Sequence, residues 1–145
     1  MSEPLLRIAD LKTHFRTKGA GLFGEKKVIK AVDGVSFDIA PCEVLSLVGE
    51  SGCGKSTVGR TLTHLEKATS GEAQFEGRNF LSMTPAEFRP LRREIQMIFQ
   101  DPFASLNPRL KIEQTLGEPL FIHGLCKTWD EARTKIAAML ETVGM

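Results

Sequence analysis

The sequence of 145 residues predicts an α/β fold. An apolar run at Val44–Val48 passes into a glycine-rich turn, and helical spacing follows from Ser56 to Leu65. The residues before this turn contain two stretches rich in β-branched and apolar side chains, which are typical of strands. Further along the chain, Thr84 and Thr128 each begin a pattern that marks the start of a helix. An apolar content of 41% is enough for an ordinary core.

The first two stretches, residues 5–15 (LLRIADLKTHF) and 28–40 (VIKAVDGVSFDIA), predict antiparallel strands. In the second stretch, apolar residues stand partly in alternation with polar neighbours: Val32, Val35 and Phe37. Residues 16–27 (RTKGAGLFGEKK) lie between the two and contain three glycines and several basic side chains, so they predict a surface loop.

Two later apolar runs do not alternate, as expected of strands that helices cover on both faces. Residues 41–49 (PCEVLSLVG) therefore predict a short buried strand. Residues 95–99 (IQMIF) predict a second one, and it ends at Gln100 because residues 101–109 (DPFASLNPR) contain two prolines. Residues 70–77 (SGEAQFEG) predict a further strand bounded by glycines.

Two capping boxes predict helix starts. The first is TPAE at Thr84–Glu87, with proline at the first helical position. The second, at Thr128–Glu131, opens a helix that ends at Gly144. The spacing places four apolar residues of this helix on one face: Ala132, Ile136, Leu140 and Val143.

Charge and composition exclude several classes of function. The chain has 19 basic and 18 acidic residues, a formal charge of +1, so nothing indicates a nucleic-acid partner. No apolar stretch approaches the roughly 18 residues of a membrane-spanning helix, and the first residues lack the pattern of a signal peptide. The three cysteines have no metal-binding spacing and predict free thiols in a soluble, cytoplasmic chain: Cys42, Cys53 and Cys126.

The glycine-rich turn matches the phosphate-binding pattern G-x-x-x-x-G-K-[ST]. Glycines allow successive backbone N–H groups to point at phosphate oxygens, and the following helix presents its positive end to the same anion. Lys55 brings a full positive charge to the β- and γ-phosphates, the Ser56 hydroxyl ligates Mg²⁺, and Thr57 adds a bond to the α-phosphate. The turn is therefore predicted to hold a nucleoside triphosphate through these residues: Gly49, Glu50, Ser51, Gly52, Cys53, Gly54, Lys55, Ser56 and Thr57.

Three segments together resemble a known family. GESGCGKST, SGEAQFEGRNF and IQMIFQDPFASLNPR are similar to the ATP-binding subunits of ABC transporters, and D-P-x-x-S-L-N-P-R resembles the oligopeptide/dipeptide importer branch. The resemblance runs from about Leu5 to Met145. It implies a P-loop NTPase fold of the ABC type: residues 1–110 form the amino-terminal half of the nucleotide-binding core, with an antiparallel β-subdomain, and residues 111–145 begin a helical subdomain.

The resemblance also implies roles for two further residues. Gln100 aligns with the family's Q-loop glutamine, which reaches Mg²⁺ and the attacking water, so that Gln100 and Lys55 are the expected catalytic residues. A surface amide is the alternative for Gln100. Phe15 stands where the family places an aromatic ring against adenine, and a core phenylalanine is the alternative there.

The implied cofactors are ATP and Mg²⁺. The implied partners are transmembrane permease subunits and a second ATPase subunit, identical or different, with a separate substrate-binding protein acting indirectly. The expected location is peripheral, on the cytoplasmic face of the membrane. In this reading the protein couples ATP hydrolysis to peptide uptake.

Three segments that the family uses for hydrolysis do not occur after Gln100: the L-S-G-G-Q signature, the apolar strand ending in Asp-Glu (Walker B), and the switch histidine. We therefore expect an amino-terminal fragment that does not turn ATP over by itself. Two alternatives stay open, a binding-only nucleotide protein without turnover and a soluble ABC-type ATPase. The D-P-x-x-S-L-N-P-R stretch argues against the second.

Overall fold

The computed structural model describes residues 3–17, 27–101 and 106–145. The chain divides into two compact units, Met1–Met97 and Ile98–Met145. The elements of the first unit are β1 (Leu6–Arg16), β2 (Val28–Ile39), α1 (Lys55–Leu62), β3 (Ser70–Phe75), β4 (Arg78–Asn79), α2 (Pro85–Phe88) and the 3₁₀-helix η1 (Pro90–Arg93). The second unit contains α3 (Ile112–Ile122) and α4 (Trp129–Thr142).

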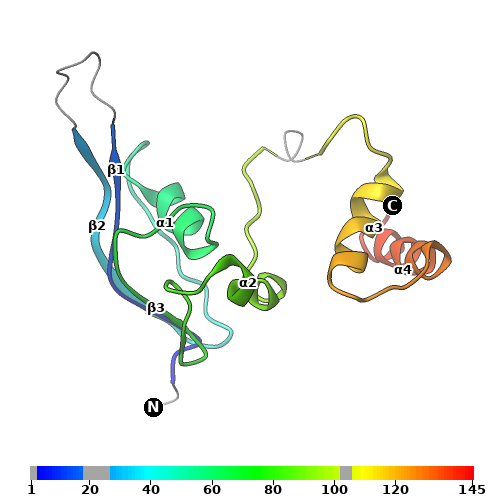
Figure 1. The fold of residues 1–145 in the computed structure, drawn as a ribbon, viewed down its shortest axis with the longest axis horizontal. Helices are drawn as coiled ribbons and strands as arrows, with labels where there is room; N and C mark the ends of the chain where they lie inside the picture. Colours follow the sequence, from blue (N-terminus) through cyan, green and yellow to red (C-terminus); the bar gives the residue numbers. More distant parts are fainter. Residues whose placement is uncertain (1–2, 18–26, 102–105) are drawn as a thin grey trace. The chain divides into compact units, whose positions relative to one another are not determined.

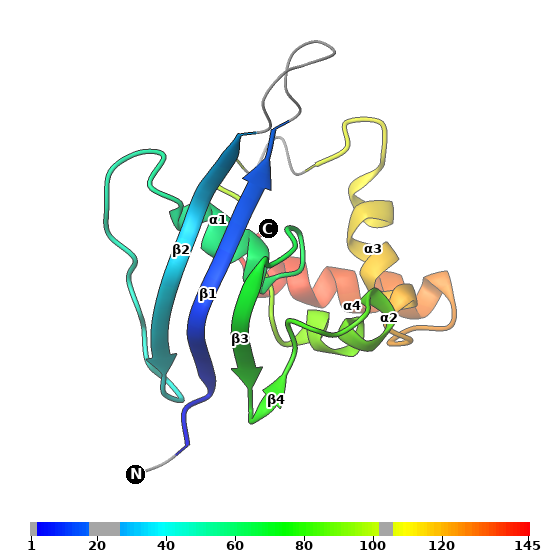
Figure 2. The same cartoon turned by 60° about the vertical axis from the view of Figure 1, so that its left-hand side comes forward.

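The first unit is built on an antiparallel sheet (Figure 1), and its strand order is β2-β1-β3-β4 (Figure 2). β1 pairs with β2 along its whole length, from Leu6 opposite Ile39 to Arg16 opposite Val28. Its other edge pairs with β3. The antiparallel strands predicted at 5–15 and 28–40 are thus confirmed, as is the strand predicted at 70–77. The loop predicted between the first two lies largely outside the described residues, at 18–26.

Helix α1 covers one face of this sheet (Figure 2). Val58 of α1 packs in one buried cluster with Ile8 and Leu11 of β1 and Val32 of β2. The periodic apolar positions of the helix and the strands thus meet in a common core. This packing fixes α1, and with it the glycine-rich turn at its amino end, against β1 and β2.

The two predicted buried strands are wrong. Residues 41–49 and 95–99 form no strand, and several of their apolar side chains are exposed rather than buried: Val44 is 90%, Val48 94% and Ile98 96% exposed. A strand exists only with a hydrogen-bonded neighbour, and the sheet of the described residues includes neither segment. A non-alternating apolar pattern indicates that both faces of a strand would have to be buried, but it does not show that a neighbouring strand is available for hydrogen bonding.

The predicted capping box at Thr84 is confirmed. The Thr84 side chain accepts a bond from the backbone N–H of Glu87, and the Glu87 carboxylate accepts one from the backbone N–H of Thr84 at 2.7 Å. These bonds satisfy two donors that the helix leaves free at its start, so α2 begins at Pro85.

The second unit is a pair of packed helices. The Trp129 ring covers Gly117 of α3, where a Cβ atom would lie 2.6 Å from Trp129 Cζ3. Thr128 caps α4 as predicted, although the Glu131 carboxylate bonds to the backbone N–H of Lys127 rather than completing the box. The prediction that the helix continues to Gly144 and carries Val143 on the same face as Ala132 is wrong, because α4 ends at Thr142 and Val143 is 69% exposed.

Among the helices in the part of the chain that the structure describes, none has both the length and the apolar character needed to cross a membrane.

Candidate functional site

The glycine-rich turn leads directly into α1. Gly52 and Gly54 have φ angles of +81° and +96°. Residues with a side chain rarely adopt such angles, so glycine is required for the turn to close. Gly54 is also the amino-terminal cap of α1. A Cβ atom at Gly54 would lie 2.1 Å from the carbonyl oxygen of Ala31 on β2. The turn therefore rests against the backbone of the sheet, at a distance that only glycine permits.

A β-bulge on β2 makes this contact. One step along β1, from Thr13 to His14, corresponds to two steps on β2, from Val32 to Lys30. Ala31 is thus the additional residue of the bulged strand. Its carbonyl oxygen faces Gly54, so the irregularity of the sheet locates the start of α1.

The amino end of α1 is open. Its first intrahelical bond runs from the N–H of Val58 to the carbonyl oxygen of Gly54 at 3.0 Å. The N–H groups of the three preceding residues, Lys55–Thr57, therefore have no acceptor within the helix. The cap residue has no side chain to bond to them, and no acidic residue lies in the first turn. Together with the helix dipole, these donors form a site for an anion.

The Lys55 side chain folds back over the turn. Its Nζ donates to the carbonyl oxygens of Gly49 at 2.7 Å and Glu50 at 2.6 Å, and lies 3.5 Å from Sγ of Cys53. Both oxygen acceptors are neutral, and among the described residues no carboxylate forms an ion pair with Lys55. The positive charge of Lys55 is therefore held at the turn without being neutralised.

A recess of about 220 Å³ lies between this turn and β2, lined by Lys55, Cys53, Gly54 and residues 31–33 among others. Asp33 is the acidic group on its border. Lys30 donates to Asp33 at 3.1 Å and His14 donates to it at 2.9 Å, and these bonds, that of Lys30 first, hold the pKa of this carboxyl below its usual value. The neighbouring cationic side chain thus offsets the negative charge beside the recess.

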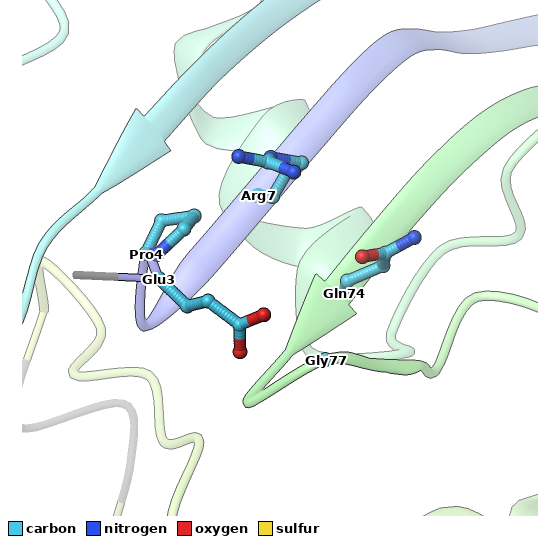
Figure 3. A pocket seen from close by; sticks show the side chains of 5 residues that line it. All are labelled: Glu3, Pro4, Arg7, Gln74 and Gly77. Atoms are coloured by element: carbon cyan, nitrogen blue, oxygen red, sulfur yellow. The ribbon is translucent and has the colours of Figure 1, made fainter. Parts of the chain in front are cut away.

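A smaller hollow lies on the sheet (Figure 3). It has a volume of about 70 Å³ and is lined by Glu3, Pro4, Arg7, Gln74 and Gly77. In Figure 3, Arg7 on β1 and Gln74 on β3 flank it. This is about a third of the volume of the recess beside the glycine-rich turn, and Glu3 brings a carboxylate to its lining. The hollow is therefore not a candidate for a nucleotide.

The structure brings the predicted residues of the turn together, from Gly49 to Thr57. Ser56 is exposed and Thr57 half-buried in the first turn of α1. Phe15 lies near the end of β1, opposite Ile29, and is 37% exposed. Gln100 is exposed and belongs to the second unit, next to residues 102–105, which lie outside the described residues. Its predicted role stays a prediction, as do the other roles assigned from the sequence.

Sequence reasoning missed two features of the site. A buried hydrogen bond joins Thr13 of β1 to Thr61 of α1 at 2.9 Å. A threonine between Leu11 and Phe15, inside an otherwise apolar strand face, is the signal that could have found it. The bulge at Ala31 leaves no comparable signal, because it depends on the register of two strands.

Comparison with known proteins gives consistent matches over the whole chain. Residues 32–145 match the ABC transporter family. A dipeptide transport ATP-binding protein of Haemophilus influenzae is 48% identical over 143 residues, covering 98% of this chain and 43% of that protein. An oligopeptide transport ATP-binding protein of Escherichia coli is 48% identical, with 97% and 43% covered. A glutathione import ATP-binding protein of Pectobacterium atrosepticum is 44% identical, with 99% and 23% covered.

A solved ATP-binding cassette, described as a dimeric post-hydrolysis state bound to ADP and Pi, superimposes with a TM-score of 0.75 at 23% identity. The match covers 97% of this chain and 57% of that one. At this identity the likeness concerns the fold, and it confirms the predicted fold class. The chain spans less than half the length of the three curated relatives.

Proposed function

Because this chain belongs to the ABC transporter family, as its motifs indicate, we propose that residues 49–57 bind the phosphates of ATP. We further propose that the protein acts as the ATP-binding subunit of a peptide importer. One observation carries the proposal: the unneutralised ammonium of Lys55 and the open end of α1 face the same turn. The relatives named above support the transport role, since their names describe import of dipeptides, oligopeptides or glutathione.

Phosphate binding is an exchange of acceptors at Lys55. In the structure its ammonium donates to two neutral carbonyl oxygens, of Gly49 and Glu50. Phosphate oxygens are anionic, and hydrogen bonds between two charged groups are roughly twice as strong as neutral ones. The β- and γ-phosphates would therefore draw Lys55 away from the carbonyls, while the N–H groups at the start of α1 bond the same phosphates.

The residues present fit a magnesium ion. The Ser56 hydroxyl is an oxygen donor at the exposed first turn of α1, and Mg²⁺ prefers oxygen ligands and keeps several waters. Ser56 would hold the ion, and the amide oxygen of Gln100 is the proposed second protein ligand. When bound, Mg²⁺ offsets charge on the phosphates. Gln100 and Lys55 are the proposed catalytic residues, with Gln100 orienting the attacking water.

The remaining parts of the proposal follow from the family. The Phe15 ring stacks on adenine, since an aromatic face accepts a base without requiring specific hydrogen bonds. The subunit works with transmembrane permease subunits and pairs with a second ATPase subunit, identical or different. A separate substrate-binding protein delivers the peptide. The location is peripheral, at the cytoplasmic face of the membrane, where ATP hydrolysis drives uptake.

Calorimetric titration with MgATP tests the phosphate site. Lys55→Ala removes charged hydrogen bonds worth about 1.5–3 kcal/mol each, so we expect the dissociation constant to rise at least 100-fold. Lys67→Ala is the matched control, because it removes the same charge from an exposed position beyond α1 and should leave the affinity unchanged. An equal effect of the two substitutions, or none at Lys55, would contradict the proposal.

A further inference from the structure

A buried hydrogen bond connects the sheet to the helix that follows the glycine-rich turn. The hydroxyls of Thr13 on β1 and Thr61 on α1 lie 2.9 Å apart, and the two residues are only 1% and 0% exposed. Among the residues that the structure describes, they are the buried polar ones, in a core that is otherwise apolar. Every buried side-chain nitrogen or oxygen in that part of the chain has a partner.

The direction of the bonds can be assigned. The Thr61 hydroxyl donates its single proton to the carbonyl oxygen of Thr57 at 2.7 Å, since a carbonyl only accepts. Thr61 must therefore accept from Thr13. Two consecutive hydrogen bonds thus connect Thr13 of β1 through Thr61 to Thr57, which lies in the proposed phosphate-binding segment.

The proposed base-stacking residue shares this strand and this face. Side chains of a strand alternate, so Phe15 extends from the same face of β1 as Thr13, two residues earlier. Thr13 faces α1, as its bond to Thr61 shows. These two hydrogen bonds therefore join β1, which carries the Phe15 ring, to α1, whose first N–H groups are the proposed donors to phosphate.

We propose that Thr13 and Thr61 are positioning residues: their hydrogen bond sets the separation between Phe15 and the phosphate-binding end of α1, so that one nucleotide can engage both. This inference rests on the proposed function. It adds to that function a structural reason why the site would bind ATP more tightly than a triphosphate without the base. Neither threonine contacts the nucleotide in this proposal.

The separation depends on a hydrogen bond and not on packing alone. Two oxygens joined by a proton lie at 2.9 Å here, whereas two carbon atoms in contact lie at about 3.5–4.0 Å. Replacing both threonines by valine would thus move α1 from β1 by about 0.6–1.1 Å. The double replacement leaves neither hydroxyl unpaired, so the fold should tolerate it. A shift of this size would weaken nucleotide binding, because Phe15 and the start of α1 would no longer be spaced to contact the same nucleotide.

The test compares two probes, MgATP and magnesium tripolyphosphate, which carries the phosphates without the base. Both are titrated by calorimetry into the wild-type chain and into Thr13→Val/Thr61→Val. We expect the affinity for tripolyphosphate to stay within about twofold and the affinity for ATP to fall about tenfold. Thr13→Ser/Thr61→Ser keeps both hydroxyls and should restore the affinity for ATP. Urea unfolding of each variant reports the fold separately.

Thr63→Val is the matched control. Thr63 follows α1, and its hydroxyl bonds to the carbonyl oxygens of Gly59 and Arg60 of that helix, at 2.9 and 3.3 Å. It also lies 4.0 Å from the sulfur of Met97, and none of these three partners lies on β1. Removing the Thr63 hydroxyl should leave the ratio of the affinities for MgATP and magnesium tripolyphosphate unchanged. If the double valine variant unfolds, the same two titrations are made with Thr13→Val alone. That variant leaves no hydroxyl unpaired, because Thr61 still donates to the carbonyl oxygen of Thr57.

Each outcome is decisive. Equal losses of affinity for both probes, or an unchanged preference for ATP, would overturn the positioning role while leaving the proposed function intact. A wild-type chain that binds neither probe would contradict the proposed function, and the positioning role would fall with it. A loss confined to ATP, reversed by the serine pair, supports the inference.

Discussion

Replacing Gly54 by alanine tests how the sheet shapes the phosphate site. The added Cβ would lie 2.1 Å from the carbonyl oxygen of Ala31, and real Cβ atoms essentially never approach closer than 3.0 Å. The turn or the bulge must therefore move by about 0.9 Å. The obstacle is backbone, so no side-chain rotation relieves it. The positive φ of +96° adds a further cost of about 1–2 kcal/mol for alanine.

Gly52→Ala is the matched control, because it isolates that conformational cost. Gly52 has a φ of +81°, but nothing lies within 4 Å of an added Cβ. The left-handed conformation alone costs about 1–2 kcal/mol, which corresponds to roughly a 5- to 30-fold loss of affinity if the strain falls wholly on the bound turn. For Gly54→Ala we expect a loss of at least 100-fold, since the donors at the start of α1 are displaced as well.

Calorimetric titration with MgATP measures both affinities, and urea unfolding shows whether the first unit stays folded. The prediction requires a clearly larger effect at Gly54 than at Gly52. If the two variants bind MgATP equally well, neither the bulge nor the contact between the turn and Ala31 shapes the site.

Three further predictions concern single side chains. Cys53 is exposed, whereas Cys126 is buried, and the Sγ of Cys53 lies 3.5 Å from Nζ of Lys55 within the proposed phosphate-binding turn. We therefore expect Cys53 to be alkylated faster than Cys126 and to be protected by MgATP, whereas Cys42, exposed outside the turn, should not be protected. Mass spectrometry of labelled peptides measures this, and labelling of Cys53 that MgATP leaves unchanged would speak against the site. Gln100→Ala should leave the affinity for ATP nearly normal and impair transport-linked hydrolysis in the assembled importer; a loss of affinity as large as that of Lys55→Ala would refute its role. Burial lowers the pKa of His64 from 6.5, against the opposing effect of its hydrogen bond to the carbonyl oxygen of Phe80. The unfolded chain therefore takes up a proton at His64 before the folded one does, so the free energy of unfolding should fall as the pH drops below about 6.5. His64→Asn, which tolerates the positive φ of this position, should show a flatter urea-midpoint profile between pH 7.5 and 5; identical profiles would contradict this cause.

Much of the secondary structure could be predicted from local sequence. β1, β2 and β3 carry their own signals in β-branched and partly alternating residues, and the caps at Thr84 and Thr128 mark helix starts because the capping bonds are local. The strands predicted at 41–49 and 95–99 are absent for the opposite reason. Strand formation there depends on a neighbour, and an apolar run contains no information about where that neighbour comes from.

The site divides in the same way. The turn and the first residues of α1 follow from the spacing of glycines, lysine and serine, since one short segment provides the whole anion site. The contact between Gly54 and Ala31 and the bond between Thr13 and Thr61 join residues far apart in the chain. Such contacts depend on the register of β1 and β2 and on the packing of α1, which no local pattern specifies.

The proposed transport role depends on whether residues 49–57 bind the triphosphate of a nucleotide. A competition titration tests it most directly: the chain is saturated with MgATP, and either magnesium tripolyphosphate or adenosine is added while bound ATP is measured. We expect saturable binding of one MgATP per chain, displaced by tripolyphosphate and lost in Lys55→Ala, with adenosine displacing far less at equal concentration. Absence of saturable binding, or displacement by adenosine but not by tripolyphosphate, would contradict it.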